Sequence, residues 1–450
     1  MAMRQDEAVS GVNVIGAGLA GSEAAWQIAL RGVKVDLYEM RPERLTPAHT
    51  TGGFAELVCS NSLGSEVPHA ASRILKDELE ALGGLVLKLA RATKVPAGAS
   101  LAVDRREFSE RITRAIEGEP LITIHRAECP RIPAEAIVVV ATGPLTSESL
   151  AADLRALVGQ ESLYFYDAIS PIVSADSLDL SKMYLKNRYD KGESADFLNI
   201  PLEKAQYEEL VGDLLSGDVV LPHAFEEERY FEGCMPVEAL AARGFLTLAH
   251  GPLKPVGLER PETGRRPYAA IQLRTENAHR TAYNLVGFQT KLKYGEQERI
   301  LRKLPGLERA EFLRLGSMHR NTYIHSPRLL QPTLQLRNQG RILIAGQLTG
   351  TEGYLESSAT GLVAGMNAAR LARGEPPLEL PPESMLGALL ATITDASRKN
   401  FQPLNANMGI LPPLPTPTRD RAVRNQLFSE RSRVKIGEWI AGQRGLVGGL

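Results

Sequence analysis

Gly16-Ala-Gly-Leu-Ala-Gly21 lies between a short apolar strand, Val12–Ile15, and a helix predicted over Ser22–Leu30. In this spacing the first glycine permits a tight turn, the second lets the main chain approach a pyrophosphate, and the third lets the helix pack closely on the strand. The free N–H groups at the start of the helix then face the anion. A second strand, Val33–Tyr38, ends at Glu39, whose carboxylate can accept hydrogen bonds from a ribose diol. This βαβ unit predicts a dinucleotide-binding fold.

Two later strands that end in glycine favour FAD as the dinucleotide. Val138–Gly143 resembles the strand and turn that FAD-dependent oxidoreductases place beside the cofactor, and Arg341–Gly346 resembles their late strand. In that superfamily the next residue is usually an aspartate, whereas here it is Gln347, whose amide can still hydrogen-bond to a ribitol hydroxyl. Each stretch alone also fits an ordinary buried strand. Their order after the first unit makes a plain NAD dehydrogenase the weaker interpretation.

Composition allows a large core and does not favour a wholly basic surface. The 450 residues are 43% hydrophobic, which at roughly 100–200 residues per domain suggests two or three domains. Lys and Arg number 52 against 53 for Asp and Glu, so the net charge is −1. No overall basic excess indicates a nucleic-acid partner, and any surface that binds one must therefore be local.

The cysteines and the apolar runs indicate the compartment. Cys59, Cys129 and Cys234 lie far apart and form no Cys-x-x-Cys pair, which argues against a disulfide framework and is typical of a reducing cytoplasm. The first residues contain acids and no apolar run, which argues against a signal peptide. No stretch of about 18 uninterrupted apolar residues predicts a transmembrane helix. We expect a cytoplasmic protein with no membrane partner, and we predict no metal site.

The distribution of motifs predicts an α/β fold in two parts. An FAD-binding Rossmann-like domain of the glutathione-reductase type would comprise residues 11–165 and 326–450, and would include a basic helical tail. Residues 166–325, which are richer in Tyr and Phe, would form an inserted α+β domain that contributes to substrate binding. Residues 41–65 are expected to form a long functional loop, and residues 70–91 are expected to be helical.

Two cysteines lie in loops that suit reactive thiols. Cys234 lies in Tyr230-Phe-Glu-Gly-Cys-Met-Pro236, and Cys59 lies in Leu57-Val-Cys-Ser-Asn-Ser-Leu-Gly64. A thiolate is a soft nucleophile that can add to an electron-poor ring carbon once a base or a positive field activates it. By residue type alone, the role of a small buried hydrophobe is favoured for each of them. Cys129 is interpreted only as a small buried hydrophobe of this kind.

Other segments carry polar or basic side chains. Residues 318–322, 350–358 and 400–407 mix hydrogen-bonding groups with an aromatic ring, which suits a flat heterocycle, although turns and helix caps are the alternative. Residues 182–191 and 254–266 are basic, and so is the tail. Such basic side chains can contact the successive phosphates of a nucleic-acid backbone, or they can form a solvated helix face without a partner. In the tail the basic residues are Arg419, Arg421, Arg424, Arg431, Arg433 and Lys435, against Asp420 and Glu430.

Several segments together resemble one family. They are Asn13–Ala25, Val58–Gly64, Gly233–Pro236, Tyr283–Thr290, Met318–Thr322 and Gly346–Tyr354. The family is that of the folate-dependent, FAD-containing tRNA uracil-5-methyltransferases, and the resemblance extends from about residue 11 to about residue 415. Segments such as the His-Arg-Asn-Thr run are not general FAD motifs, so the match is specific.

The resemblance implies a bacterial enzyme that forms 5-methyluridine at position 54 in the T loop of tRNA. The one-carbon unit would come from 5,10-methylenetetrahydrofolate, and the electrons from FAD reduced by NADH or NADPH. The family's catalytic cysteine falls on Cys234, its second functional cysteine on Cys59, and its tetrahydrofolate-stacking tyrosine on Tyr354. Cys59 would either accept the proton from uracil C5 or shield the flavin. The partners would be the T arm of tRNA and tetrahydrofolate, and the protein would be a monomer or a weak homodimer.

The motifs and the resemblance together assign FAD contacts to four groups of residues. They are Gly16, Ala17, Gly18, Leu19, Ala20 and Gly21 with Glu39 and Arg41; Asn61, Ser62, Leu63 and Gly64; Ala141, Thr142 and Gly143; and Gly346, Gln347, Gly353 and Tyr354.

Three other functions stay open. The first is a related, longer FAD enzyme that modifies the wobble uridine of tRNA, and this chain lacks room for the extra C-terminal helical domain of that enzyme. The second is a small-molecule flavin oxidoreductase, which the near-zero net charge supports. The third is an FAD-stabilised scaffold that binds tRNA without catalysis.

Overall fold

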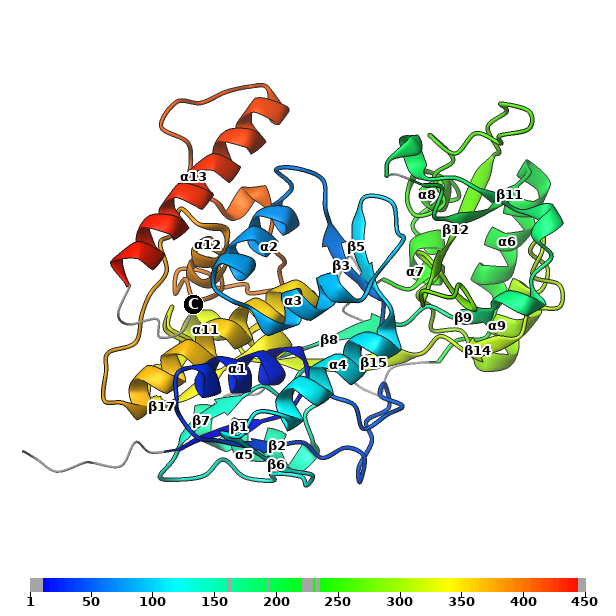
Figure 1. Cartoon of the computed structure of the whole chain (residues 1–450). Coiled ribbons are helices and arrows are strands. Elements are labelled where there is room, and N and C mark those ends of the chain that lie inside the picture. The colour runs from blue at the N-terminus through cyan, green and yellow to red at the C-terminus, as the bar shows by residue number, and fades with distance from the viewer. Residues whose placement is uncertain (1–10, 160–162, 193, 221–229, 231–234, 444–450) are drawn as a thin grey trace, which may run out of the picture.

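The computed structural model describes residues 11–159, 163–192, 194–220, 230 and 235–443, without the side chains of residues 163–165 and 320. Figure 1 shows a larger lobe that contains the N-terminal strands and the C-terminal helices, and a smaller lobe formed by the middle of the chain. Two long strands, β8 (Leu163–Ala168) and β15 (Met318–Tyr323), lie between the lobes and pair with each other in antiparallel fashion.

The larger lobe is built on a six-stranded sheet with the order β16-β17-β7-β1-β2-β6. All neighbours pair in parallel except β16 and β17. The strands are β1 (Val12–Ile15), β2 (Val35–Tyr38), β6 (Ile122–His125), β7 (Ile137–Val140), β16 (Gln335–Leu336) and β17 (Gln339–Ile344). The central strands carry fully buried Val, Leu and Ile side chains, as expected for a parallel sheet. The predicted α/β fold class, with its Rossmann-like FAD-binding unit, is confirmed.

Helices of the larger lobe pack on this sheet and on each other, and α1 and α11 make the closest pair. The helices are α1 (Leu19–Leu30), α2 (Ala71–Ala81), α3 (Leu85–Ala92), α4 (Arg105–Glu117), α5 (Glu148–Val158), α10 (Ser326–Leu329), α11 (Tyr354–Ala372), α12 (Met385–Ile393) and α13 (Arg421–Gly442). The helical stretch predicted over 70–91 is two helices, because Gly83 adopts a φ of +76° between them. A small sheet with the order β3-β5-β4 lies beside α2; its strands are β3 (Ser62–Ser65), β4 (Lys94–Val95) and β5 (Ser100–Val103).

The smaller lobe has its own six-stranded antiparallel sheet, with the order β10-β11-β12-β13-β9-β14. The strands are β9 (Ile172–Ser174), β10 (Tyr184–Leu185), β11 (Leu198–Leu202), β12 (Ala269–Thr275), β13 (Ala282–Leu285) and β14 (Phe312–Arg314). The helices are α6 (Lys204–Ser216), α7 (Val237–Ala242), α8 (Thr247–His250) and α9 (Tyr294–Leu301). This lobe buries a separate hydrophobic cluster. The division of the chain at residues 165 and 325 into domains stays a prediction.

Two buried glutamates join helices that are distant in sequence. Glu23 of α1 accepts hydrogen bonds from the N–H groups of Leu85 and Val86 at the start of α3, at 3.1 and 2.8 Å. Glu78 of α2 accepts from the first two N–H groups of α12, both at 2.7 Å, and from the hydroxyl of Ser432 in α13. Each carboxylate thus satisfies N–H groups that a helix start leaves without intrahelical partners. Within the described residues, no helix is long and apolar enough to cross a membrane.

The buried position of Glu78 predicts that the stability of the protein depends on pH. Burial raises its pKa from 4.5 to about 7, so the folded protein binds a proton more readily than the unfolded chain between those values. The contribution of Glu78 to the free energy of unfolding is therefore complete below pH 4.5 and is lost as the pH rises through 7. The loss is at most about 1.4 kcal/mol for each pH unit. We expect the melting temperature of Glu78→Gln to fall less steeply between pH 5 and 7.5 than that of the wild type.

The matched control is Glu80→Gln, which removes another exposed acid on the same helix and should keep the wild-type slope. A Glu78→Gln protein whose melting temperature follows the wild-type pH profile would contradict the assignment of a proton to Glu78.

Candidate cofactor and thiol site

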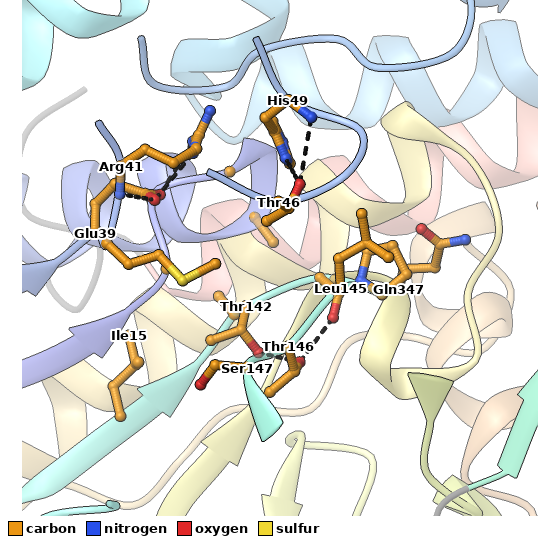
Figure 2. Close-up of a pocket in the computed structure, with 18 of the residues that line it drawn as sticks. Ile15, Glu39, Arg41, Thr46, His49, Thr142, Leu145, Thr146, Ser147 and Gln347 are labelled. Carbon is orange, nitrogen blue, oxygen red and sulfur yellow. Dashed lines mark hydrogen bonds and ion pairs between the residues drawn. The ribbon is translucent and has the colours of Figure 1, made fainter. Parts of the chain in front are cut away.

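A cavity of about 1020 Å³, open solvent at its mouth included, lies where β1, β2, β7 and β17 end. This is the edge at which parallel α/β sheets bind nucleotides. Figure 2 shows its walls: Glu39 and Arg41 after β2, Thr142 and Thr146 after β7, and Gln347 after β17. The residues predicted to contact FAD that line it are Gly16, Gly18, Leu19, Ala20, Glu39, Arg41, Ala141, Thr142, Gly143, Gly346, Gln347 and Tyr354.

The glycine turn leaves room where a pyrophosphate would lie. A Cβ atom built on Gly18 has no neighbour within 4 Å, and Gly18 is the N-cap of α1 without a side-chain hydrogen bond. A Cβ atom on Gly21 would lie 1.7 Å from the carbonyl oxygen of Gly16, so this position tolerates only glycine. The helix therefore starts directly against the strand, with its N–H groups facing the cavity, and the residues fit the predicted cofactor.

Glu39 is a buried, ionised acceptor at the end of β2. Its carboxylate accepts hydrogen bonds from the N–H of Ala17 at 2.9 Å and from the guanidinium of Arg41 at 3.0 and 3.1 Å. Burial opposes its ionisation, but the hydrogen bonds and charge of Arg41 outweigh that effect and lower the pKa of Glu39. The pair fixes a negative charge beside the glycine turn, which suits the hydroxyl groups of a ribose.

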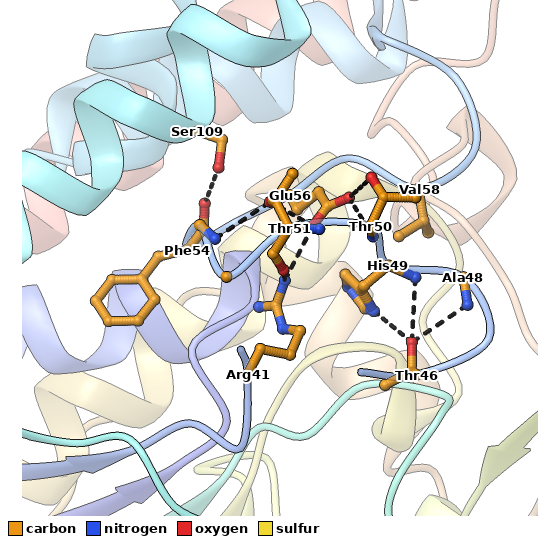
Figure 3. A network of polar contacts seen from close by, with 12 residues as sticks. Arg41, Thr46, Ala48, His49, Thr50, Thr51, Phe54, Glu56, Val58 and Ser109 are labelled. Carbon is orange, nitrogen blue, oxygen red and sulfur yellow. Dashed lines mark hydrogen bonds and ion pairs between the residues drawn. The ribbon is translucent and has the colours of Figure 1, made fainter. Parts of the chain in front are cut away.

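The long loop after β2 is held by a network around Glu56, drawn in Figure 3. Arg41 donates to Glu56 at 3.2 Å, and the hydroxyls of Thr50 and Thr51 donate to the same carboxylate at 3.0 and 2.8 Å. His49, which bonds Thr46 at 2.6 Å, lines the cavity, and burial and the charge of Arg41 lower its pKa to about 4. The imidazole is thus neutral at pH 7. The predicted functional loop over 41–65 therefore forms a wall of the cavity as far as Val58, and its last four residues are not a loop but strand β3.

A second cavity, of about 1630 Å³ with its open mouth included, lies between β3, the start of α11 and the start of α13. Of the predicted FAD contacts, Ser62, Leu63, Gly64, Gly353 and Tyr354 line it. Two of the predicted polar segments meet here, because the N–H of Ala406 donates to Glu356 at 3.0 Å and the N–H of Glu352 donates to the Leu404 carbonyl at 2.9 Å. The third polar segment, 318–322, forms most of β15 instead.

Cys59 and Tyr354 lie at the wall that the two cavities share. Val58 lines the first cavity, Ser60 lines the second, and Tyr354 lines both. The N–H of Cys59 donates a hydrogen bond of 2.7 Å to the hydroxyl of Tyr354. Burial, and then the neighbouring Cys59, raise the pKa of Tyr354, so the phenol stays neutral. Cys59 itself is partly exposed and lines neither cavity, but its main chain lies at the boundary between them.

Gln347 and Glu352 form a second link across this wall. The Gln347 amide, which faces the first cavity, donates a 2.6 Å hydrogen bond to Glu352, which lines the second. Burial, and then the charge of Asp167, raise the pKa of Glu352 well above its usual value. The amide and the neutral carboxyl together provide an uncharged polar link at the position where related folds usually carry an aspartate.

Three of the predicted FAD contacts, Ala17, Gly21 and Asn61, do not line either cavity among the described residues. Ala17 contributes its N–H to Glu39, and Gly21 provides the close helix–strand contact. The Asn61 amide donates to the carbonyls of Val103 and Thr275 at 2.9 and 3.0 Å. Its side chain therefore joins the two lobes in this structure, and a contact with FAD stays a prediction.

Cys234 lies outside the described residues, but the chain that follows it is described. The N–H of Val237 donates to the carbonyl of Gln289 at 2.7 Å, and buried Glu238 accepts from the hydroxyl of Thr290. Burial raises the pKa of Glu238. The family-like segment that ends at Thr290 thus anchors the start of α7, immediately after the Cys-Met-Pro run.

Sequence reasoning missed a group of residues that line the first cavity. They are Tyr38, Met40, Thr46, His49, Glu56, Val58, Glu128, Cys129, Thr146, Ser147 and Ser357. Their one available signal was proximity in sequence to a motif, either directly after a strand or in the long loop. Cys129, interpreted as a small buried hydrophobe, is half-buried in this wall, and burial raises its pKa. Among the residues that the structure describes, no cluster of His, Cys, Asp and Glu could hold a metal ion.

Known proteins resemble this chain over nearly its full length. The family model described as "Glucose inhibited division protein A" matches residues 11–376. The methylenetetrahydrofolate–tRNA-(uracil-5-)-methyltransferase TrmFO of Listeria innocua is 53% identical over 94% of this chain and 96% of its own length. The enzyme of the same name from Geobacter sulfurreducens is 54% identical over 96% and 99%, and that from Exiguobacterium is 56% identical over 90% and 92%.

The same architecture occurs in a solved structure. GidA of Aquifex aeolicus superposes with a TM-score of 0.70 and 19% identity, and the match covers 100% of this chain and 75% of that one. At this identity the likeness concerns the fold alone.

The glycine turn predicts opposite results for two single-methyl substitutions. Gly18→Ala places its methyl in open space, so the cofactor-free protein should keep its melting temperature while its affinity for FAD falls by about tenfold or more. Gly21→Ala places its methyl against the Gly16 carbonyl and should lower the melting temperature of the cofactor-free protein by several degrees. Differential scanning fluorimetry and flavin fluorescence titration measure both quantities. Equal effects of the two variants on FAD affinity and melting temperature would contradict the separate roles of Gly18 in cofactor binding and Gly21 in helix–strand packing.

Proposed function

The chain belongs to the family of methylenetetrahydrofolate–tRNA-(uracil-5-)-methyltransferases, and on this basis we propose that it forms 5-methyluridine at position 54 in the T loop of tRNA. The proposed carbon donor is 5,10-methylenetetrahydrofolate, and the proposed source of electrons is NADH or NADPH acting through FAD. The observation that carries the proposal is the shared wall, at which Tyr354 lines both the cavity beside the glycine turn and the second cavity and accepts a hydrogen bond from the Cys59 N–H.

The first cavity is proposed to hold FAD, which supplies the reducing electrons when bound. The start of α1 at Gly18 would receive the pyrophosphate, and Glu39 the ribose of the adenosine half. Gln347 would lie beside the ribitol chain. Neutral His49 and Tyr354 line the same space without adding charge to it.

The second cavity is proposed to receive the folate and the target uracil. Its wall offers an aromatic ring, Tyr354, on which a flat heterocycle can stack, and two acidic side chains, Glu352 and Glu356, for edge contacts. Burial raises the pKa of Glu356 to about 7, so neutral and ionised forms are both accessible at physiological pH. Exposed Arg421 at the rim is suited to a carboxylate or a phosphate.

The proposed chemistry uses the two thiols in different roles. Carbon 5 of uracil is a poor nucleophile, and addition of a thiolate at carbon 6 moves an electron pair to the carbonyl oxygen on carbon 4, which gives an enolate whose carbon 5 is nucleophilic. Cys234 is proposed to form this bond. Carbon 5 would then bond to the one-carbon unit of methylenetetrahydrofolate and lose its proton, and the bond between Cys234 and carbon 6 would break when a hydride supplied through reduced FAD completes the methyl group. Cys59, at the wall beside the cofactor cavity, is proposed either to accept that proton or to shield the flavin.

The basic tail is proposed to contact tRNA near the second cavity. Arg419, Arg421 and Arg424 are exposed around the start of α13, and Arg421 and Asn425 line the cavity rim. Arg431 is used differently, because its guanidinium donates to the carbonyls of Pro412 and Pro413 at 2.7 and 2.9 Å. The proposed tRNA footprint is therefore the beginning of the helix, from which a flipped uridine would enter the cavity.

The function is tested with purified protein, methylenetetrahydrofolate, NADPH and an unmodified tRNA transcript. We expect 5-methyluridine, detected by nucleoside mass spectrometry, and loss of at least about 100-fold in rate for Cys234→Ala, since the nucleophile is removed. A transcript with cytidine at the target position serves as the control substrate. NADPH oxidation that proceeds equally without tRNA, with no methylated nucleoside, would instead identify a small-molecule oxidoreductase.

The footprint is tested by replacing Arg419, Arg421 and Arg424 together with Gln. Each lost phosphate contact should reduce the slope of log K against log salt by about 0.7–0.9, so tRNA affinity should fall about tenfold or more at low salt. Filter binding across a salt series measures this. Arg433→Gln, at an exposed position in the middle of the same helix, is the matched control and should bind like the wild type. Unchanged affinity and slope in the triple variant would remove the start of α13 from the footprint.

A further inference from the structure

Three consecutive carbonyl groups that end at Cys59 accept hydrogen bonds from arginine side chains. This part of the chain forms no strand or helix, so its carbonyls need other partners. Arg105 donates to the carbonyls of Leu57 and Cys59, the latter at 3.0 Å. Arg314 donates to the Val58 carbonyl at 2.9 Å. With the bond from the Cys59 N–H to a phenol hydroxyl, both main-chain groups of the thiol residue are held by distant side chains.

The arginines also hold the residues on either side. The second terminal nitrogen of Arg314 donates to the Ala48 carbonyl at 3.0 Å. One guanidinium group therefore links Ala48 to Val58 within the loop that follows β2. Arg274 donates through Nε to the side-chain oxygen of Asn61 at 2.8 Å. Asn61 in turn donates to the Thr275 carbonyl. Residues 57–61, here called the thiol loop, thus rest on three guanidinium groups.

These contacts cross from one lobe to the other. Arg274 belongs to β12 and Arg314 is the last residue of β14, both in the sheet of the smaller lobe. Arg105 starts α4 in the larger lobe, but its Nε donates to Glu276, directly after β12, at 2.7 Å. Arg274 and Glu276 are both less than a tenth exposed. The position of the thiol loop is therefore defined by the smaller lobe as much as by the cofactor-binding lobe that contains it.

We propose that Arg105, Arg274 and Arg314 are positioning residues for Cys59, which hold its main chain at the boundary between the two cavities. The catalytic consequence rests on the proposed function, whereas the geometric claim does not. The smaller lobe, which contributes Arg274 and Arg314, also contains α7 and the described residues that lead into it.

Arginine is the side chain that this arrangement requires. A guanidinium offers several N–H donors in one rigid plane and can bind two carbonyls at once, as Arg105 and Arg314 do. A lysine at either position keeps the charge but provides a single donor group that cannot span both oxygens in fixed geometry. The lysine variants therefore separate the effect of charge from that of bidentate hydrogen bonding.

The test measures how fast iodoacetamide alkylates Cys59 in FAD-loaded protein that carries Cys129→Ser and Cys234→Ser. Arg314→Met should release the partly exposed thiol and speed its alkylation about threefold or more, and Arg314→Lys should give an intermediate rate. In proteins with all three cysteines, Arg314→Met should lower kcat for tRNA methylation about tenfold while KM for tRNA and FAD content stay within about twofold. If Arg314→Met loses FAD, the same comparison is made with Arg314→Lys.

The matched control is Arg302→Met, because Arg302 also donates to a carbonyl, that of Ala310, but lies away from the thiol loop. It should match the wild type in alkylation and in kcat. An alkylation rate for Arg314→Met and Arg314→Lys equal to or below that of Arg302→Met would overturn the proposal. Because alkylation needs no tRNA or folate, this outcome is distinct from a failure of the proposed function, in which no variant and no wild-type protein would methylate tRNA.

Discussion

The contact between Gly21 and the Gly16 carbonyl is the constraint on which the cofactor-binding lobe depends. The first helix can start directly at the end of the first strand only because no side chain separates them. That close start places the N-terminus of α1 at the edge of the cavity. Two further glycines, Gly361 and Gly365, let α11 pack directly on the main chain of α1. α11 then carries Tyr354 to the wall that separates the two cavities. Close main-chain approaches at Gly21, Gly361 and Gly365 therefore bring together residues more than 300 positions apart in the chain.

Buried carboxylates connect the remaining elements, each by a different balance of burial and partners. Arg41 keeps Glu39 ionised beside the glycine turn. Glu78, which has N–H and hydroxyl donors but no cation bonded to it among the described residues, has a raised pKa and joins α2, α12 and α13. The difference follows from charge: a paired guanidinium compensates the cost of burying an anion, whereas neutral donors compensate only part of it. Glu39, beside the cofactor cavity, thus stays ionised at neutral pH, whereas Glu78, which joins three helices, changes its charge near pH 7.

The sequence predicted the parts of the site that short-range patterns encode, and not those that distant residues assemble. The strands before Gly16 and Gly143 were placed within a residue or two, because a buried strand followed by glycine is a local signal. Residues 41–65 were predicted to be a loop, but their partners, such as Arg314 on the Val58 carbonyl, are 256 positions away and carry no local pattern. The sequence likewise could not show that Tyr354 reaches both cavities, or that Asn61 turns toward the other lobe.

The sequence separations of the thiol loop's hydrogen bonds have a consequence for biosynthesis. The bonds around Cys59 join residues 46, 256 and 295 positions apart, so two of the three close very long loops of chain. Such contacts are entropically costly to form and come late in folding. A ribosome that has released only the first third of the chain has exposed the whole βαβ unit, but neither Arg314 nor Tyr354. The surroundings of Cys59 are therefore completed only after the smaller lobe and the start of α11 have been synthesised.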